Sequence, residues 1–140
     1  MNTIMMLVNL ESTALRIDDI FSIMKQAIQI ARKSPLRVKH GCIIVNRGNI
    51  VGYGRNTYCS KYRSGSSLMS LHAEIDAINN IPRTLLWGAE IYIIRICEDD
   101  GSMIHLGNSH PCSDCAKKLN KFKKYGIKVY YSMPTIIHIK

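Results

Sequence analysis

The sequence contains no long apolar run. Its longest purely apolar stretches are about five residues, as at 4–8, whereas a membrane-spanning helix needs about twenty. The N-terminus also lacks the basic leader and the longer apolar segment of a signal peptide. We therefore expect no membrane span and no secretory signal.

The sequence also lacks an even set of cysteines. Five cysteines leave one over after any disulfide pairing, and the three-residue step from Cys112 to Cys115 suits a metal better than a disulfide framework. Cys42 and Cys97 fall in strand-like runs, where a buried free cysteine behaves as a small apolar residue. These features favour a reducing, cytoplasmic location.

Acidic residues are few. Ten stand against 19 lysines and arginines, which gives a formal net charge of +9. This excess favours acidic partners, either nucleotides or nucleic acid, without choosing between them. The densest basic cluster falls on one predicted helix and the strand after it: Lys117, Lys118, Lys121, Lys123, Lys124 and Lys128. We interpret it as a solvated helix face, with a nucleic-acid surface as the alternative.

Internal repeats, low-complexity tracts and credible linkers are absent. A chain of 140 residues is large enough for one packed core, so we expect a single domain over 1–140, with 1–16 as a short helix, an arm or a loose tail. Apolar residues at three- and four-residue steps predict an amphipathic helix over 17–33. Two β-rich runs, 41–46 and 49–55, flank a glycine-containing turn and predict a hairpin.

The remaining elements alternate between helix and strand. We expect helices over 71–80 and from just after Pro111 through the run 116–124, and strands over 90–98, 102–106 and 128–132, with 136–140 as an edge strand or a partner contact. This order implies one α/β domain, in which helices cover both faces of a mixed sheet.

Three good zinc ligands stand out: His72, Cys112 and Cys115. A structural zinc site is normally closed by four protein ligands, whereas a catalytic site offers three and leaves a position for water. Both cysteines follow Pro111, which is tolerated where a helix begins, so the helix dipole would favour the metal-binding thiolates there. His72 starts another predicted helix, with Ser70 as its cap. Two helix starts would therefore hold one metal between them.

Glu74 distinguishes a catalytic zinc site from a structural one. A carboxylate beside a zinc-activated water can take its proton and hand it to a leaving group, whereas an ordinary surface glutamate would only stabilise the first turn of its helix. A non-catalytic, zinc-stabilised binding module would need a fourth ligand, most plausibly Cys59, His110 or Cys97. We favour the catalytic interpretation, because three ligands and an adjacent acid occur together.

The pairing of His72-Ala73-Glu74 with Pro111-Cys112-Ser113-Asp114-Cys115 resembles the signature of the zinc-dependent cytidine/deoxycytidylate deaminase superfamily. The resemblance implies a three-layer α/β/α domain with Zn²⁺ as cofactor. It assigns the histidine and both cysteines as zinc ligands and Glu74 as the proton shuttle of a hydrolytic deaminase. It also implies a homo-oligomer.

The resemblance extends from about residue 40 to 132. The run 41–56 looks like the family's opening hairpin, whose closing asparagine, here Asn56, contacts substrate; by the same resemblance Ala73 is a substrate-binding residue. The segments 115–117 and 126–132 look more like the deoxycytidylate branch. We therefore expect a free cytosine nucleotide as substrate, with dCMP converted to dUMP.

A predicted loop at 57–69 leaves two questions open. Its Lys61 and Arg63 could bind the substrate phosphate or belong to a solvated connection. Tyrosines at 53, 58 and 62 could instead stack the bases of tRNA or single-stranded DNA, which makes a polynucleotide deaminase the second candidate. The base, cytosine or adenine, also stays open.

Overall fold

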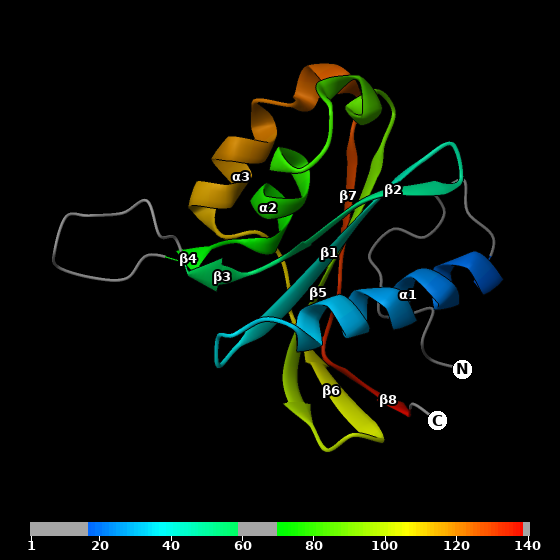
Figure 1. Cartoon of the computed structure of the whole chain (residues 1–140), viewed down its shortest axis with the longest axis vertical. Helices are drawn as coiled ribbons and strands as arrows, with labels where there is room; N and C mark the ends of the chain where they lie inside the picture. Colours follow the sequence, from blue (N-terminus) through cyan, green and yellow to red (C-terminus); the bar gives the residue numbers. More distant parts are fainter. Residues whose placement is uncertain (1–16, 59–69, 139–140) are drawn as a thin grey trace, which may run out of the picture.

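A computed structural model describes residues 17–58 and 70–138 (Figure 1). The expected N-terminal arm at 1–16 lies outside these ranges. The elements follow in the order α1 (Ile17–Arg32), β1 (Lys39–Asn46), β2 (Asn49–Arg55), β3 (Thr57–Tyr58), β4 (Ser70–Leu71), α2 (Ala73–Asn79), η3 (Arg83–Leu86), β5 (Glu90–Asp99), β6 (Met103–Gly107), α3 (Ser113–Asn120), η4 (Lys123–Tyr125), β7 (Lys128–Tyr131) and β8 (Thr135–His138). Among the described helices, none combines the length and the apolar character needed to cross a bilayer.

Strand β5 is the centre of a six-stranded sheet. On one side it pairs with β1 antiparallel, and β1 continues into the hairpin with β2. On its other side β5 changes neighbour along its length: residues 90–93 pair with β7 in parallel, and residues 95–99 pair with β6 antiparallel. Strand β8 then extends the sheet beyond β6. The expected mixed sheet is confirmed, with one parallel pair.

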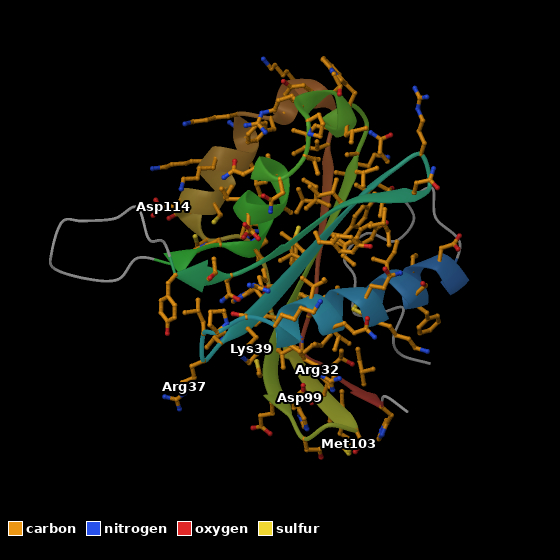
Figure 2. All side chains as sticks on the ribbon, viewed as in Figure 1. Arg32, Arg37, Lys39, Asp99, Met103 and Asp114 are labelled. Carbon is orange, nitrogen blue, oxygen red and sulfur yellow. The ribbon has the colours of Figure 1, made fainter. Side chains whose placement is uncertain are left out.

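Helices cover both faces of this sheet, so the expected three-layer α/β/α architecture is confirmed (Figure 1). Alternate residues of β1 and β5 point to opposite faces. Ile43 and Tyr92 pack with α1, while Ile44 and Ile93 pack with α2. At its end α1 is also tied to β5, because the Arg32 guanidinium donates two hydrogen bonds, of 2.7 and 3.0 Å, to the Asp99 carboxylate (Figure 2).

The predicted hairpin turn is confirmed. Arg47 and Gly48 adopt φ values of 52° and 79°, the left-handed pair of a tight hairpin turn that suits the twist of the flanking strands. Farther along β2, Gly54 faces the first turn of α2. A Cβ added at Gly54 would collide with the Ala73 carbonyl oxygen and lie 2.5 Å from the Ala77 nitrogen. The absence of a side chain at Gly54 therefore lets α2 lie close against the sheet.

Two expected helix boundaries are wrong. The helix predicted over 71–80 begins only at Ala73, because Ser70 and Leu71 are extended and pair with β3. Its N-cap residue is His72 and no side chain caps it, so the predicted cap at Ser70 is also wrong. The helix expected after Pro111 does begin there, at Ser113, but it ends at Asn120 rather than at 124, before the separate turn η4.

Candidate active site

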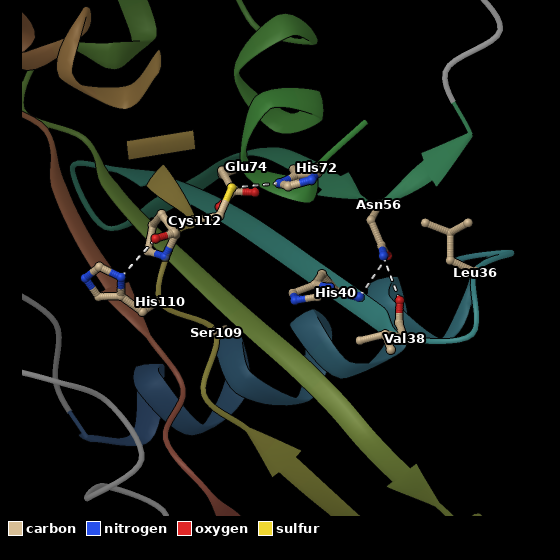
Figure 3. Close-up of a pocket in the computed structure, with 10 residues that line it drawn as sticks. Leu36, Val38, His40, Asn56, His72, Glu74, Ser109, His110 and Cys112 are labelled. Atoms are coloured by element: carbon tan, nitrogen blue, oxygen red, sulfur yellow. Dashed lines mark hydrogen bonds between the residues drawn. The ribbon is translucent and has the colours of Figure 1, made fainter. Parts of the chain in front are cut away.

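The two halves of the zinc pattern meet where two helices begin. His72 is the N-cap residue of α2 and Cys112 is the N-cap residue of α3. The Nδ1 atom of His72 lies 2.7 Å from the Cys115 Sγ. It lies 3.7 Å from the Cys112 Sγ (Figure 3). The prediction that two helix starts bring these side chains together is therefore confirmed.

The donor set fits Zn²⁺. The three ligand atoms all lie within 4.8 Å of one another, and a tetrahedral zinc with nitrogen and sulfur ligands separates them by roughly 3.5 Å. Within the described ranges, no fourth His, Cys, Asp or Glu joins the group. One nitrogen and two sulfurs with no fourth protein ligand are the donors of a catalytic site rather than a closed structural one.

Glu74 lies in the first turn of α2 and is only 5% exposed. Burial raises the pKa of its carboxyl group. This rise is opposed by a hydrogen bond from its own backbone, by the charge of His72 and by a hydrogen bond with Cys115. A carboxyl group with a raised pKa exchanges its proton more readily near neutral pH than an ordinary glutamate. Its environment is therefore that of a general acid–base rather than of a solvated residue.

The side chains around Cys115 disfavour its thiolate form. Burial raises the pKa of its thiol, and the neighbouring Glu74 and Cys112 raise it further. The expected contribution of the helix dipole to a metal-bound thiolate stays a prediction. A bound cation reverses this balance, since a coordinating thiol is deprotonated.

A cavity of about 340 Å³ opens beside these residues (Figure 3). This volume is within the range of pockets that hold small molecules. Its lining is Leu36, Val38, His40, Asn56, His72, Glu74, Ser109, His110, Pro111 and Cys112. One wall is thus apolar, whereas the opposite end carries the acid and two of the three metal ligands.

Asn56 does line this cavity, but its side chain is already hydrogen-bonded. Its Oδ1 accepts from the His40 backbone nitrogen at 2.8 Å and its Nδ2 donates to the Val38 carbonyl at 2.7 Å (Figure 3). Asn56 therefore fixes the chain entering β1, and its contact with substrate stays a prediction. Ala73 is fully buried in the core beneath α2 and is absent from the cavity lining, so a substrate contact there also stays a prediction.

His40 lies in the wall of the cavity, a position that no sequence motif indicated. It lies opposite Arg95 in the pairing of β1 with β5. Burial, assisted by the charges of Arg95 and His72, lowers its pKa to about 4. The cavity therefore has a neutral imidazole in its wall, able both to donate and to accept a hydrogen bond.

Two buried serines, Ser109 and Ser132, support the chain before Cys112, and no sequence pattern pointed to them. The Ser109 hydroxyl donates to the Ile93 carbonyl at 2.7 Å and accepts from the Ser132 nitrogen at 2.7 Å. The Ser132 hydroxyl donates to Gly107 at 2.8 Å. These hydrogen bonds satisfy backbone groups at the point where the pairing partner of β5 changes from β7 to β6. They also fix the chain just before Cys112. Only a knowledge of the strand order could have revealed this role.

The other candidate metal ligands lie apart from the group of His72, Cys112 and Cys115. His110 lies on the cavity rim, where its ring meets Tyr131 edge-on at 4.6 Å, and Cys97 is exposed on β5. The predicted positions Cys59, Lys61 and Arg63 lie outside the described residues.

Comparison with solved structures supports the fold. The crystal structure of dCMP deaminase from the cyanophage S-TIM5 in apo form has a TM-score of 0.53 at 20% identity, covering 85% of this chain and 100% of that one. The same enzyme in complex with dCMP and dUMP has a TM-score of 0.51 at 19% identity, covering 84% and 98%. Among curated protein sequences, none matches significantly.

Family membership rests on the sequence itself. The family described as the cytidine and deoxycytidylate deaminase zinc-binding region matches residues 18–133. This span includes the three ligands and Glu74, whose geometry fits a zinc-dependent hydrolase. The chain belongs to the cytidine and deoxycytidylate deaminase family.

Proposed function

We propose that this protein deaminates a free cytosine nucleotide, converting dCMP to dUMP. The observation that carries the proposal is the buried carboxyl group of Glu74, which lines the same cavity as the His72 and Cys112 ligands. A carboxyl group that can carry protons, beside the position where a metal would act, is what supports the proposal.

The chain's own residues supply binding and proton transfer. Zinc held by His72, Cys112 and Cys115 would supply the Lewis acidity that activates water at neutral pH. Glu74 takes one proton from the attacking water and delivers it to the ring nitrogen next to the reacting carbon. It then takes the second proton from the hydroxyl now bonded to that carbon and delivers it to the amino group, so that the C–N bond breaks, the carbonyl forms and ammonia leaves. The net change is the addition of water and the loss of ammonia.

Two observations support a nucleotide rather than a polynucleotide as substrate. The cavity has the volume of a small-molecule pocket, and its Leu36 and Val38 wall offers apolar contact for a sugar. The structurally similar cyanophage enzyme is a dCMP deaminase whose complex contains dCMP and dUMP. We propose further that Lys61 and Arg63 bind the 5′-phosphate.

A substrate panel tests the proposal. Purified protein is given dCMP, CMP, cytidine, single-stranded DNA and tRNA, with ammonia release and product base as readouts. We expect dCMP to give the highest kcat/KM. Preferential reaction with single-stranded DNA or tRNA, with dCMP inert, would contradict the substrate while leaving the acid–base role of Glu74 intact.

Two matched variants test the proposed contact between Arg63 and the substrate phosphate. Arg63→Ala should lower kcat/KM for dCMP more than for cytidine, since only dCMP offers a charge-assisted phosphate contact. Arg47→Ala removes an equal charge from the hairpin tip, outside the residues that line the cavity, and should leave both substrates unchanged. Equal losses on dCMP and cytidine in Arg63→Ala would rule out a phosphate-binding role.

The oligomeric state and the cellular location are each proposed from a single observation. By family resemblance we propose a homo-oligomer, which light scattering on purified protein tests. The odd cysteine count is the basis for proposing a reducing, cytoplasmic location.

A further inference from the structure

Exposed acids and most exposed cations gather at different ends of the sheet. The acids lie at the turn between β5 and β6, around Asp99, with Arg32, Arg37 and Lys39 also toward that end (Figure 2). Most exposed cations gather around α3, the turns η3 and η4, the β1–β2 hairpin and the starts of β5 and β7: Arg47, Arg83, Lys117, Lys118, Lys121, Lys123, Lys124 and Lys128. We call this set the basic end. The acids among these elements are Asp114, at the start of α3, and Glu90, which is buried and accepts a hydrogen bond from Tyr92.

An exposed tryptophan lies within the basic end. Trp87, the single tryptophan of the chain, is 58% exposed, although tryptophan is usually well buried. Its backbone is nevertheless fixed from two sides: its carbonyl accepts from the Asn46 side chain at 3.1 Å, and the next nitrogen, that of Gly88, donates to Tyr125 at 2.8 Å. The indole also meets the Tyr125 ring edge-on at 4.7 Å. It is therefore an exposed aromatic side chain on an anchored backbone.

The surface beside this indole is hollowed. A cavity of about 500 Å³ lies between the hairpin tip and the start of β5, and its lining includes Arg47, Trp87 and Lys128 together with the buried acid Glu90. An aromatic ring flanked by cations is the combination that binds nucleobases together with their phosphates, because a base stacks on the ring while the cations neutralise the backbone.

The extent of the basic end favours a strand over a single nucleotide. Its cations continue from the cavity along η4 and α3, and α3 alone, with eight residues, is about 12 Å long. One nucleotide could contact only the cations around Trp87. A polyanion could neutralise those on α3 as well and would release counterions from each contacted phosphate.

We propose that the basic end binds single-stranded nucleic acid, with a base stacked on Trp87 and backbone phosphates bound by Arg47 and by the lysines of α3 and η4. The surface lies at the end of α3 away from Cys112, so binding there needs no base in the active-site cavity. The proposal is therefore independent of the proposed deamination of dCMP.

The test uses an oligothymidylate of about 20 nucleotides, which cannot be deaminated because thymine has no amino group. Binding should quench the fluorescence of Trp87 and weaken with salt. Trp87→Ala should weaken binding by roughly 5- to 150-fold, as measured by anisotropy of a labelled strand. Tyr53→Ala, which removes a ring that is 45% exposed on β2, should leave binding unchanged.

Charge reversal provides the second comparison. Lys121→Glu with Lys124→Glu should reduce the slope of log affinity against log salt by about 1.4, since each phosphate contact contributes about 0.7 for a single strand. Lys25→Glu with Lys33→Glu makes the same change in net charge near α1, on the other face of the sheet, and should leave the slope unchanged. Turnover of dCMP and thermal unfolding report whether each variant is folded.

Three results would overturn the proposal. The first is absence of both quenching and binding at low salt. The second is an equal loss of affinity in the two charge-reversed pairs, which would mean that net charge alone attracts the strand. The third is binding of dTMP as tight as that of the oligothymidylate, which would make the cavity a mononucleotide site.

Discussion

Glu74 is the side chain on which the proposed chemistry depends most directly. Glu74→Gln keeps the size of the residue and removes its acid–base function, so we expect kcat to fall by about 10²- to 10⁴-fold. Zinc should stay at one ion per chain, because the group of three ligands excludes Glu74. Metal analysis and ammonia release measure the two quantities on one preparation. Full turnover in the variant would exclude Glu74 as the proton carrier.

His40 should make stability depend on pH. Its folded-state pKa of about 4 lies below its ordinary value of 6.5. Between these values the unfolded chain binds a proton that the folded chain does not, so stability falls as the pH is lowered from 6.5 to 4, by roughly 2–3 kcal/mol in full. Denaturant unfolding of the wild type and of His40→Gln at a series of pH values measures this difference.

The wild type should lose stability relative to His40→Gln as the solution is acidified through this window. Because both proteins keep Glu74 and the three ligands, their contributions cancel in the comparison. Parallel pH profiles would show that His40 keeps an ordinary pKa in the folded protein.

At the scale of the elements, local patterns predicted local structure well. Apolar spacing predicted α1, and a glycine turn between β-rich runs predicted the β1–β2 hairpin. The start of α2 was misplaced because residues 70–71 pair with β3, a contact that no local pattern encodes. The position of His40 in the cavity wall likewise depends on the strand register that sets it opposite Arg95. The three candidate zinc ligands could be predicted from the sequence, because histidine and closely spaced cysteines are typical zinc donors.

Gly54 tests how closely α2 must approach β2. A Cβ at this position would meet the backbone of the first turn of α2, so Gly54→Ala should destabilise the protein by about 1–3 kcal/mol or more, as overpacking does. It should also lower turnover, because that turn carries Glu74. Denaturant unfolding and dCMP turnover are the measurements.

Gly101→Ala is the control for this change. Gly101 has a φ of +96° but open space where a Cβ would lie, so alanine there strains only the turn between β5 and β6. We expect a loss of stability without a loss of turnover. If Gly54→Ala behaved in the same way, close packing of α2 would not be what positions Glu74.

At the scale of the whole molecule, the metal ligands join two helices on the same face of the sheet. The core beneath α2 extends to Leu119 of α3, whereas the α1 core on the opposite face contains none of the ligands. Bound zinc would therefore stabilise one side of the sheet directly. The serines at 109 and 132 add to this side by fixing the chain before Cys112. The sequence could predict the ligands but not this division, which depends on which face each helix covers.

Removal of zinc should consequently loosen one face more than the other. Any ligand that binds only the folded chain adds to its stability, so a chelator should lower the melting temperature. Hydrogen exchange should rise in α2 and α3 and change little in α1. Cys112→Ser should abolish the response to chelator, whereas Cys97→Ser, the matched change at another exposed cysteine, should keep it. A uniform rise in exchange across α1, α2 and α3 would show instead that the metal holds the whole fold together, and that the two cores unfold as one cooperative unit.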